Sequence, residues 1–94
     1  MVFDLSEVTG IGDYQEKNEK ERTLYFKGDK VFLVVNKNTI EVRTDGELKN
    51  LLTEKYESVM ESRYFGRGGI EIVLAGQLGV DDLNDLVRLS YNLS

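Results

Sequence analysis

"RTLYFKGDKVFLVVNKNTIEVR", Arg22 to Arg43, is the stretch of sequence that decides the fold. It begins with two runs of β-forming residues, Arg22–Phe26 and Val31–Val35, which flank the turn-forming stretch Lys27–Lys30. A Gly-Asp turn between two such runs is typical of a β-hairpin. Because Val31–Val35 is apolar throughout, we expect it to form a central strand that is covered on both faces.

A second turn and a third strand follow directly. Asn tolerates left-handed backbone angles, so Asn36–Asn38 predicts another tight turn. In Thr39–Arg43 aliphatic and charged residues alternate, which places Glu41 and Arg43 on the face opposite the aliphatic pair. We interpret this charged face as solvated. Together the three strands predict an antiparallel meander.

The pattern then changes to that of a helix. Thr44–Glu47 has the Thr-x-x-Glu spacing of a capping box. The apolar residues after it recur at helical spacing and are Leu48, Leu51, Leu52 and Tyr56. We therefore expect an amphipathic helix of about three turns, with Val59 and Met60 finishing its packing through a looser link.

A glycine-rich stretch, "RYFGRGGIEIVL" at Arg63–Leu74, comes next. Its spacing does not match the Gly-x-Gly-x-x-Gly dinucleotide fingerprint or a P-loop, and a strand rather than a helix follows it. We interpret Gly66, Gly68 and Gly69 as a flexible loop that permits positive φ and close backbone approach. This loop would feed a buried strand, Ile70–Leu74.

The two ends of the chain complete the expected elements. Val80–Leu93 predicts a helix that Asp81 or Asp82 caps. The predicted buried stripe of this helix consists of Leu83, Leu86, Val87 and Tyr91. At the other end, Asp4–Val8 predicts a short helical turn, and the polar run Tyr14–Arg22 predicts a solvated loop.

Length and composition limit the classes of protein that fit. Ninety-four residues, 40% hydrophobic and 31% charged, predict a single globular domain over residues 1–94, in which residues 1–21 form a short acidic N-terminal segment. The order of strands and helices predicts the α+β class, with helices on one face of an antiparallel sheet. The absence of cysteine and histidine excludes disulfides, Cys-His and Ser-His-Asp catalysis and His-bound metals.

The location expected from the sequence is the cytoplasm. The first ten residues lack a basic region followed by an apolar run, so they do not resemble a secretory signal. The longest apolar run, Val31–Val35, is far shorter than the ~20 residues that span a bilayer. We expect no membrane association.

The chain resembles the MmcQ/YjbR-like family over residues 22–94. In that family a strand with a Gly-Lys-hydrophobic-Phe pattern leads through a second strand into a helix, and a last helix carries a Ser-Tyr-x-hydrophobic signature. The matching segments here are "KGDKVFLVV", "TIEVRTDGELKNLL", "GIEIVL" and "VDDLNDLVRLSYNLS", with the signature at Ser90-Tyr91-Asn92-Leu93. The resemblance implies a CyaY-like (frataxin-like) fold and DNA binding.

Two features depart from the family pattern. Residues 1–21 are short, acidic and free of proline, where family members begin with a longer helix and a proline-containing segment. The late strand also lacks the Trp-bearing element of the family and reads Gly68-Gly69-Ile70. No site residue is therefore carried over at that position.

The basic residues supply the candidate nucleic-acid contacts. They lie at the expected turns and strand ends and are Lys27, Lys30, Lys37, Arg43, Arg63 and Arg67. The alternative interpretation is that lysines at turns and edges keep a sheet from aggregating. The net charge of −5 disfavours tight, nonspecific binding to nucleic acid.

The acidic residues supply weaker candidates. Asp81, Asp82 and Asp85 lack calcium-loop spacing, and helix capping explains them, so we expect no metal and no cofactor. Glu41 and Glu71 fall on neighbouring strands, where a catalytic pair is conceivable, but solvated sheet positions explain them as well.

We therefore expect a non-enzymatic binding module that binds DNA weakly through its basic hairpin turns. The alternative is a protein-interaction or small-ligand module that uses the glycine turn and the exposed sheet face.

Overall fold

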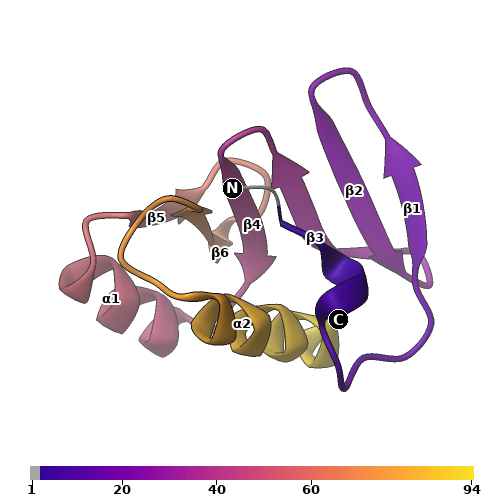
Figure 1. Cartoon of the computed structure of the whole chain (residues 1–94). Coiled ribbons are helices and arrows are strands. Elements are labelled where there is room, and N and C mark those ends of the chain that lie inside the picture. The colour runs from indigo at the N-terminus through magenta and orange to yellow at the C-terminus, as the bar shows by residue number, and fades with distance from the viewer. Residues whose placement is uncertain (1–2) are drawn as a thin grey trace.

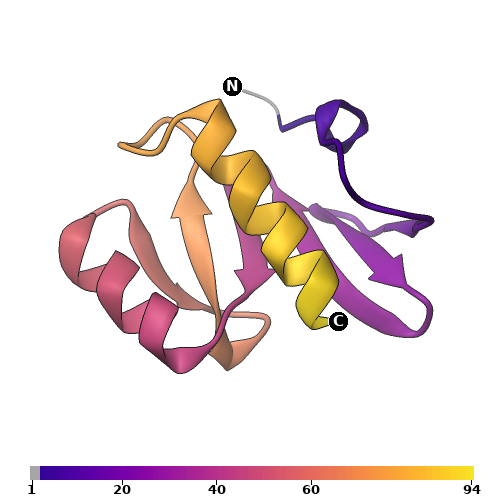
Figure 2. The same ribbon diagram turned by 90° about the horizontal axis from the view of Figure 1, so that it is seen from below.

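The computed structural model describes residues 3–94 and contains one six-stranded antiparallel sheet with the strand order β1-β2-β3-β4-β6-β5. The strands are β1 (Gln15–Asn18), β2 (Arg22–Lys27), β3 (Lys30–Asn36), β4 (Thr39–Arg43), β5 (Val59–Ser62) and β6 (Gly66–Val73). The helices are η1 (Leu5–Glu7), α1 (Gly46–Lys55) and α2 (Val80–Leu93). Both α-helices lie on the same side of the sheet (Figure 1), with α2 crossing its middle strands (Figure 2). The α+β class with helices on one face is therefore confirmed.

The central meander forms as predicted. β2 and β3 pair up to Lys27 and Lys30, across a turn in which Gly28 has φ 65°. The four residues Val31–Val34 are buried, so this strand is covered on both faces. Val35 at its end is half-buried.

Alternation along the strands divides their side chains between two apolar clusters. The larger cluster lies between the sheet and the helices, where strand residues such as Ile40 and Ile72 pack with Leu83 and Val87 of α2. A smaller cluster on the helix-free face consists of Leu24, Val31 and Val34, with Phe26 and Phe65 packed against it. On the helix-free face this apolar cluster covers the middle of β2 and β3 and does not extend to β4 or β6.

The prediction of a solvated loop over Tyr14–Arg22 is wrong in part. Its residues Gln15–Asn18 form β1, an edge strand paired with β2, although all four side chains are exposed. An edge strand with only polar side chains shows no alternation of burial and so leaves no periodic signal. Its polar character suits an edge that must not pair with other chains.

Two further predictions about the later strands are corrected. Val59 and Met60 belong to an edge strand, β5, rather than to a looser link that follows the helix. The glycines do not form a loop, because β6 begins at Gly66, and the bend itself lies at residues 63–65. Gly66 supplies the positive φ, 60°, that ends this bend.

Close backbone approach is needed at one glycine of β6. A Cβ on Gly69 would lie 2.4 Å from the carbonyl oxygen of Val42 and 2.8 Å from Cβ of Phe65. The same atom on Gly68 would meet only the Phe65 carbonyl oxygen, at 3.6 Å. The predicted close approach is therefore confirmed at Gly69.

The residues that cap the two α-helices differ from those predicted, although α2 spans Val80–Leu93 as expected. Asp45 rather than Thr44 caps α1, since its carboxylate accepts a hydrogen bond from the backbone N–H of Leu48 at 2.7 Å. In α2 the cap is Gly79, without a side-chain bond, and the two predicted caps lie inside the first turn. The buried stripe of α2 is as predicted, but Leu51 of α1 is 60% exposed. Asp4 caps the predicted N-terminal turn, η1.

Candidate functional site

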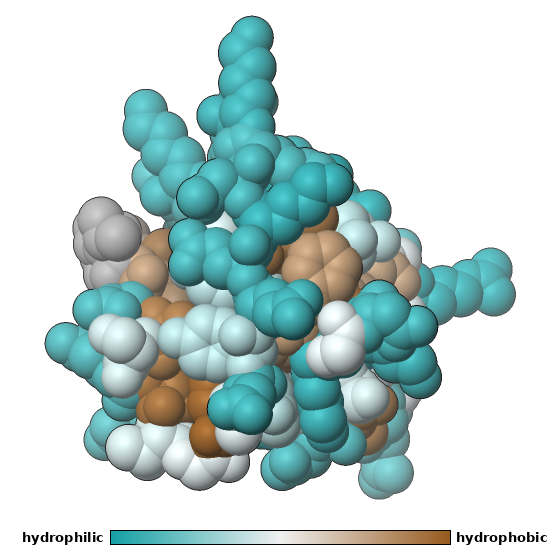
Figure 3. All heavy atoms as spheres, turned by 90° about the vertical axis from the view of Figure 1, so that its right-hand side faces the viewer, coloured by the Kyte–Doolittle hydropathy of each residue, from teal (hydrophilic) through white to brown (hydrophobic). Residues whose placement is uncertain are grey.

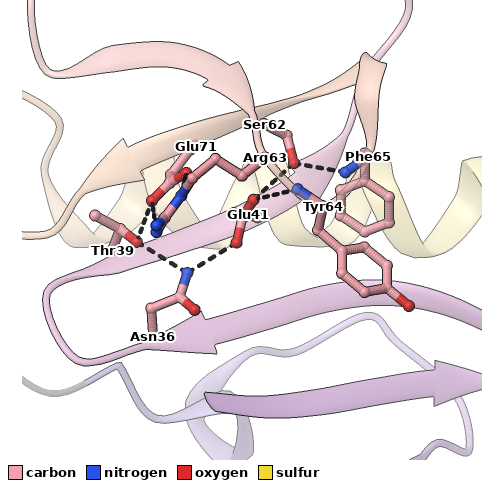
Figure 4. Close-up of polar contacts among 8 residues, drawn as sticks. All are labelled: Asn36, Thr39, Glu41, Ser62, Arg63, Tyr64, Phe65 and Glu71. Carbon is pink, nitrogen blue, oxygen red and sulfur yellow. Dashed lines mark hydrogen bonds and ion pairs between the residues drawn. The ribbon is translucent and has the colours of Figure 1, made fainter. Parts of the chain in front are cut away.

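Two carboxylates are buried on the helix-free face. Glu41 of β4 and Glu71 of β6 are direct partners in the antiparallel register and are only 1% and 3% exposed. The alternation in the sequence places them on the correct face, but the prediction that they are solvated is wrong. The reason is that the turn after β5, residues 63–65, folds over this part of the sheet (Figure 4).

Glu41 ties that turn to the sheet. Its Oε1 accepts hydrogen bonds from the hydroxyl of Ser62 and from the backbone N–H of Tyr64, both at 2.8 Å. Its Oε2 accepts one from Nδ2 of Asn36 at 2.9 Å. The Ser62 hydroxyl in turn accepts from the N–H of Phe65 at 2.8 Å. Both oxygens of a buried carboxylate are thus satisfied, as burial requires.

Glu71 holds Arg63 in a fork. Nε and Nη2 of the guanidinium donate to its two carboxylate oxygens at 2.9 and 2.7 Å, and the Thr39 hydroxyl donates to Oε2 at 2.8 Å. Burial raises the pKa of Glu71, but the hydrogen bonds from Arg63 and Thr39 outweigh it and leave the pKa below its ordinary value. Glu71 therefore stays ionised at neutral pH.

An open polar groove lies beside this network. Its volume is about 1460 Å³, and it runs between the β1–β2 turn and the β3–β4 turn. The lining residues are Glu19, Lys20, Glu21, Arg22, Thr23, Val35, Asn36, Lys37, Asn38, Thr39, Glu41 and Arg63. Hydrophilic side chains cover most of the upper part of the molecule on the β1–β2 side, and several project outward (Figure 3). The groove is thus an accessible polar surface.

The six predicted basic contacts do not form one surface. Lys27 and Lys30 face each other at one end of the β2–β3 pair, whereas Lys37 follows the opposite end of β3. A strand of seven residues separates these ends by roughly 20 Å. Arg43 lies at the end near Lys30, because its Nε donates to the carbonyl of Val31.

Several of these bases already have structural partners. Nζ of Lys27 donates to the carbonyl of Tyr91 at 3.1 Å and lies 4.6 Å from the centre of its ring. The guanidinium of Arg43 stacks over Phe65 at 4.9 Å. Of the six predicted residues, only Lys37 and Arg63 line the groove.

Arg67 and the glycines belong to the strand rather than to a contact loop. Gly66 pairs with Ser62, and Gly69 pairs with Arg43. The N–H of Gly68 donates to the carbonyl of Phe65 at 3.2 Å. The predicted loop of Gly66, Gly68 and Gly69 is therefore corrected to the paired start of β6.

The acidic side chains give no metal centre. Within residues 3–94 no group of three or more acidic side chains is arranged to hold a metal ion. Asp81 and Asp82 lie in the first turn of α2, and Asp85 pairs with Arg88 at 2.5 Å. Across the same described residues, no helix is long and apolar enough to cross a membrane.

Several residues of the site are not among those predicted from the sequence. Asn36, Thr39 and Ser62 complete the network around the carboxylates, and Lys20 and Arg22 line the groove. One signal was available, because each glutamate interrupts a β-branched strand at its centre, in "TIEVR" and "GIEIV". No local pattern indicates the covering turn, because it comes from a separate part of the chain.

Comparisons of the chain with known protein families, with curated proteins and with solved structures found no match.

Proposed function

We propose that the protein is a non-catalytic binding module that binds an extended polypeptide segment in the groove between the β1–β2 and β3–β4 turns. The observation that carries the proposal is the groove itself, a polar surface that is lined in part by Arg63 of the turn that Glu41 and Glu71 hold in place. It joins the exposed sheet face to the turn before β6.

The carboxylate pair supports a binding role better than a catalytic one. All four oxygens of Glu41 and Glu71 accept hydrogen bonds from the protein itself. A general acid or base must instead reach the proton of a substrate. The pair therefore acts as a clamp for the turn.

The size and openness of the groove support a polypeptide rather than a small molecule. Pockets for small ligands typically enclose about 300–1,000 Å³ and are mostly apolar. This groove is larger, open and lined by polar side chains. An extended segment can lie along such a surface and exchange hydrogen bonds with it.

Duplex DNA fits the molecule less well. The groove is lined by four basic and three acidic side chains, and the remaining predicted contacts lie elsewhere. Affinity for DNA depends on many phosphate contacts made together, and the whole chain carries a net charge of −5. The resemblance to the MmcQ/YjbR-like family, with the DNA binding that it implies, stays a prediction.

Chemical-shift titration of the ¹⁵N-labelled protein tests the proposal. The probes are a 12-base-pair DNA duplex, at two salt concentrations, and octapeptide mixtures randomised over uncharged residues with a central Gln, Lys or Glu. We expect the peptides to shift amides of the groove, such as Lys37 and Thr39, and the duplex to leave them in place. Shifts with the duplex that span both ends of the sheet and vanish with salt would support DNA binding instead. If no peptide mixture moves the groove amides, the proposal fails.

A further inference from the structure

We infer that Arg63 is the anchor of this groove and binds a single oxyanion of the ligand, a carboxylate or a phosphate, through the free edge of its guanidinium. The inference rests on the proposed function, since it names the chemical group that the groove selects. It concerns recognition by one side chain rather than a general positive surface.

The geometry of the Arg63 guanidinium leaves one bidentate edge unused. Arginine carries five N–H donors in a planar fork. Glu71 takes the edge formed by Nε and Nη2. Within residues 3–94 no acceptor is bonded to Nη1, so the edge formed by Nη1 and Nη2 remains available. Two parallel N–H groups on such an edge match the oxygens of a carboxylate or phosphate.

The same side chain is both held and accessible. Its partner Glu71 is only 4% exposed as a side chain, whereas Arg63 is 75% exposed and lines the groove. A buried carboxylate that is itself bonded to Thr39 fixes the plane of the guanidinium. A long side chain that is already ordered loses less conformational freedom when it binds. Arg63 is therefore presented to the groove in an oriented state.

The charges around Arg63 favour one oxyanion over a polyanion. Arg22, at the start of β2, is paired with Glu19 at 2.7 Å and stacks over the Tyr64 ring, 5.2 Å from its centre. Lys20 and Lys37 also line the groove, but Glu21 and Glu41 offset them. The positive and negative charges that line the groove therefore nearly cancel. The two N–H groups of Arg63 supply the oriented hydrogen bonds to an oxyanion.

The test compares octapeptide mixtures that are randomised over uncharged residues and differ only in the central residue, which is Glu, phosphoserine or Gln. Binding is followed by the amide shifts of Asn36–Thr39 and by the side-chain Nε–H resonance of Arg63. We expect the Glu or phosphoserine mixture to bind about fivefold to tenfold more tightly than the Gln mixture. The tighter of the two identifies the source of the oxyanion. Either preference supports the inference.

Two substitutions separate the effect of the bidentate hydrogen-bonding geometry from the effect of the positive charge. Arg63→Lys keeps the positive charge but removes the bidentate edge, so the preference for the oxyanion should fall to about twofold or less. Arg67→Lys, on β6 outside the groove, is the matched control and should retain the preference. If Arg63→Lys does not fold, the shift of the Arg63 Nε–H resonance in the wild-type protein decides the question.

The outcomes distinguish this inference from the proposed function. Equal binding of all three mixtures, or an unchanged preference in Arg63→Lys, overturns the role of Arg63 and leaves the groove as a binding site. An Arg63 Nε–H resonance that does not shift while the groove amides do also overturns the role of Arg63 and leaves the groove as a binding site. No shift of the groove amides with any mixture overturns both.

Discussion

At the scale of single residues, the main feature of the molecule is a pair of buried glutamates at the centres of two aliphatic strands. Glu41 and Glu71 are buried, yet each of their oxygens has a donor. An unpaired buried charge would cost several kcal/mol. The network therefore holds as a unit, and its loss would release the turn that it fixes.

The pKa of Glu71 leads to a prediction about acid stability. Because its pKa is lowered in the folded state, Glu71 stabilises the fold above its ordinary value of 4.5, and this contribution is lost as the pH falls through the lower, folded-state pKa. Glu71→Gln should be less stable than the wild-type protein at pH 7 and should lose less stability between pH 5 and pH 2. Urea unfolding across that pH range measures both effects.

Glu61→Gln is the matched control for this prediction. Glu61 is also paired with a base, Lys49, but it is largely exposed, so solvent screens the pair. Its removal should change the pH dependence much less. If the free energy of unfolding depends on pH in the same way in Glu71→Gln and in the wild-type protein, ionised Glu71 does not stabilise the fold.

A second residue-scale prediction concerns the glycines of β6. Gly69→Ala places a methyl group against the Val42 carbonyl and Phe65, so it should lower the free energy of unfolding by about 1–3 kcal/mol. Gly68→Ala, one residue away, would meet only the Phe65 carbonyl oxygen at an ordinary contact distance and should change it by less than about 0.5 kcal/mol. Chemical denaturation of both variants is the measurement. Equal losses would show that strand propensity rather than close approach governs this segment.

At the scale of elements, Ser90 fixes α2 against the sheet. Its hydroxyl donates to the carbonyl of Phe32 at 2.6 Å and accepts from the N–H of Arg43 at 2.7 Å. Phe32 has no partner in β2, because the pairing register shifts beside it. One side chain therefore satisfies backbone groups of two strands, β3 and β4.

This contact predicts a large effect of a small substitution. Ser90→Ala leaves the carbonyl of the buried Phe32 and the half-buried N–H of Arg43 without the Ser90 hydroxyl and should destabilise the protein by about 1–3 kcal/mol in urea unfolding. Ser94→Ala, at the end of the same helix, removes one bond to the helix itself and should have little effect. A Ser90→Ala variant as stable as the wild-type protein would mean that packing alone positions α2.

The elements differ in how clearly the sequence indicates them. β2 and β3 carry runs of β-forming residues, whereas β4 and the buried face of α2 carry periodic patterns, and these predictions are confirmed. β1 and β5 are short edge strands whose side chains do not alternate in burial, so they leave no periodic signal. The capping-box spacing predicts Thr44 as the cap of α1, but Asp45, one residue later, supplies the hydrogen bond. The hydroxyl of Thr44 is instead buried without a partner within residues 3–94.

At the scale of the whole molecule, the sheet separates packing from recognition. The helices cover one face and complete the core (Figure 1), while the opposite face carries the carboxylate network (Figure 4). The groove opens beside that network. The basic residues that looked like one cluster in the sequence are distributed between two ends of the sheet. The strand pairing decides which turns lie at the same end of the sheet, and the order of residues along the chain does not.

For the same reason, the site could be predicted only in part. The sequence indicated the glycine turn and the exposed sheet face as an alternative binding region. Strand residues such as Thr23 and Thr39 line the groove, whereas Gly66, Gly68 and Gly69 do not. The sequence could not indicate that Asn36 and Ser62 meet at one carboxylate, since that contact joins residues from separate strands. Long-range pairing decides such contacts, and local propensity does not.

The central claim is that the buried glutamates hold the turn of residues 63–65 against the helix-free face. Amide hydrogen exchange at Tyr64 and Phe65, followed by NMR at pH 7, tests it most directly, because these two N–H groups donate to Glu41 and to Ser62. We predict that both amides exchange at least about tenfold more slowly than unprotected amides of the same sequence. Exchange of both at the unprotected rate, while the amides of β4 and β6 stay protected, would contradict the claim.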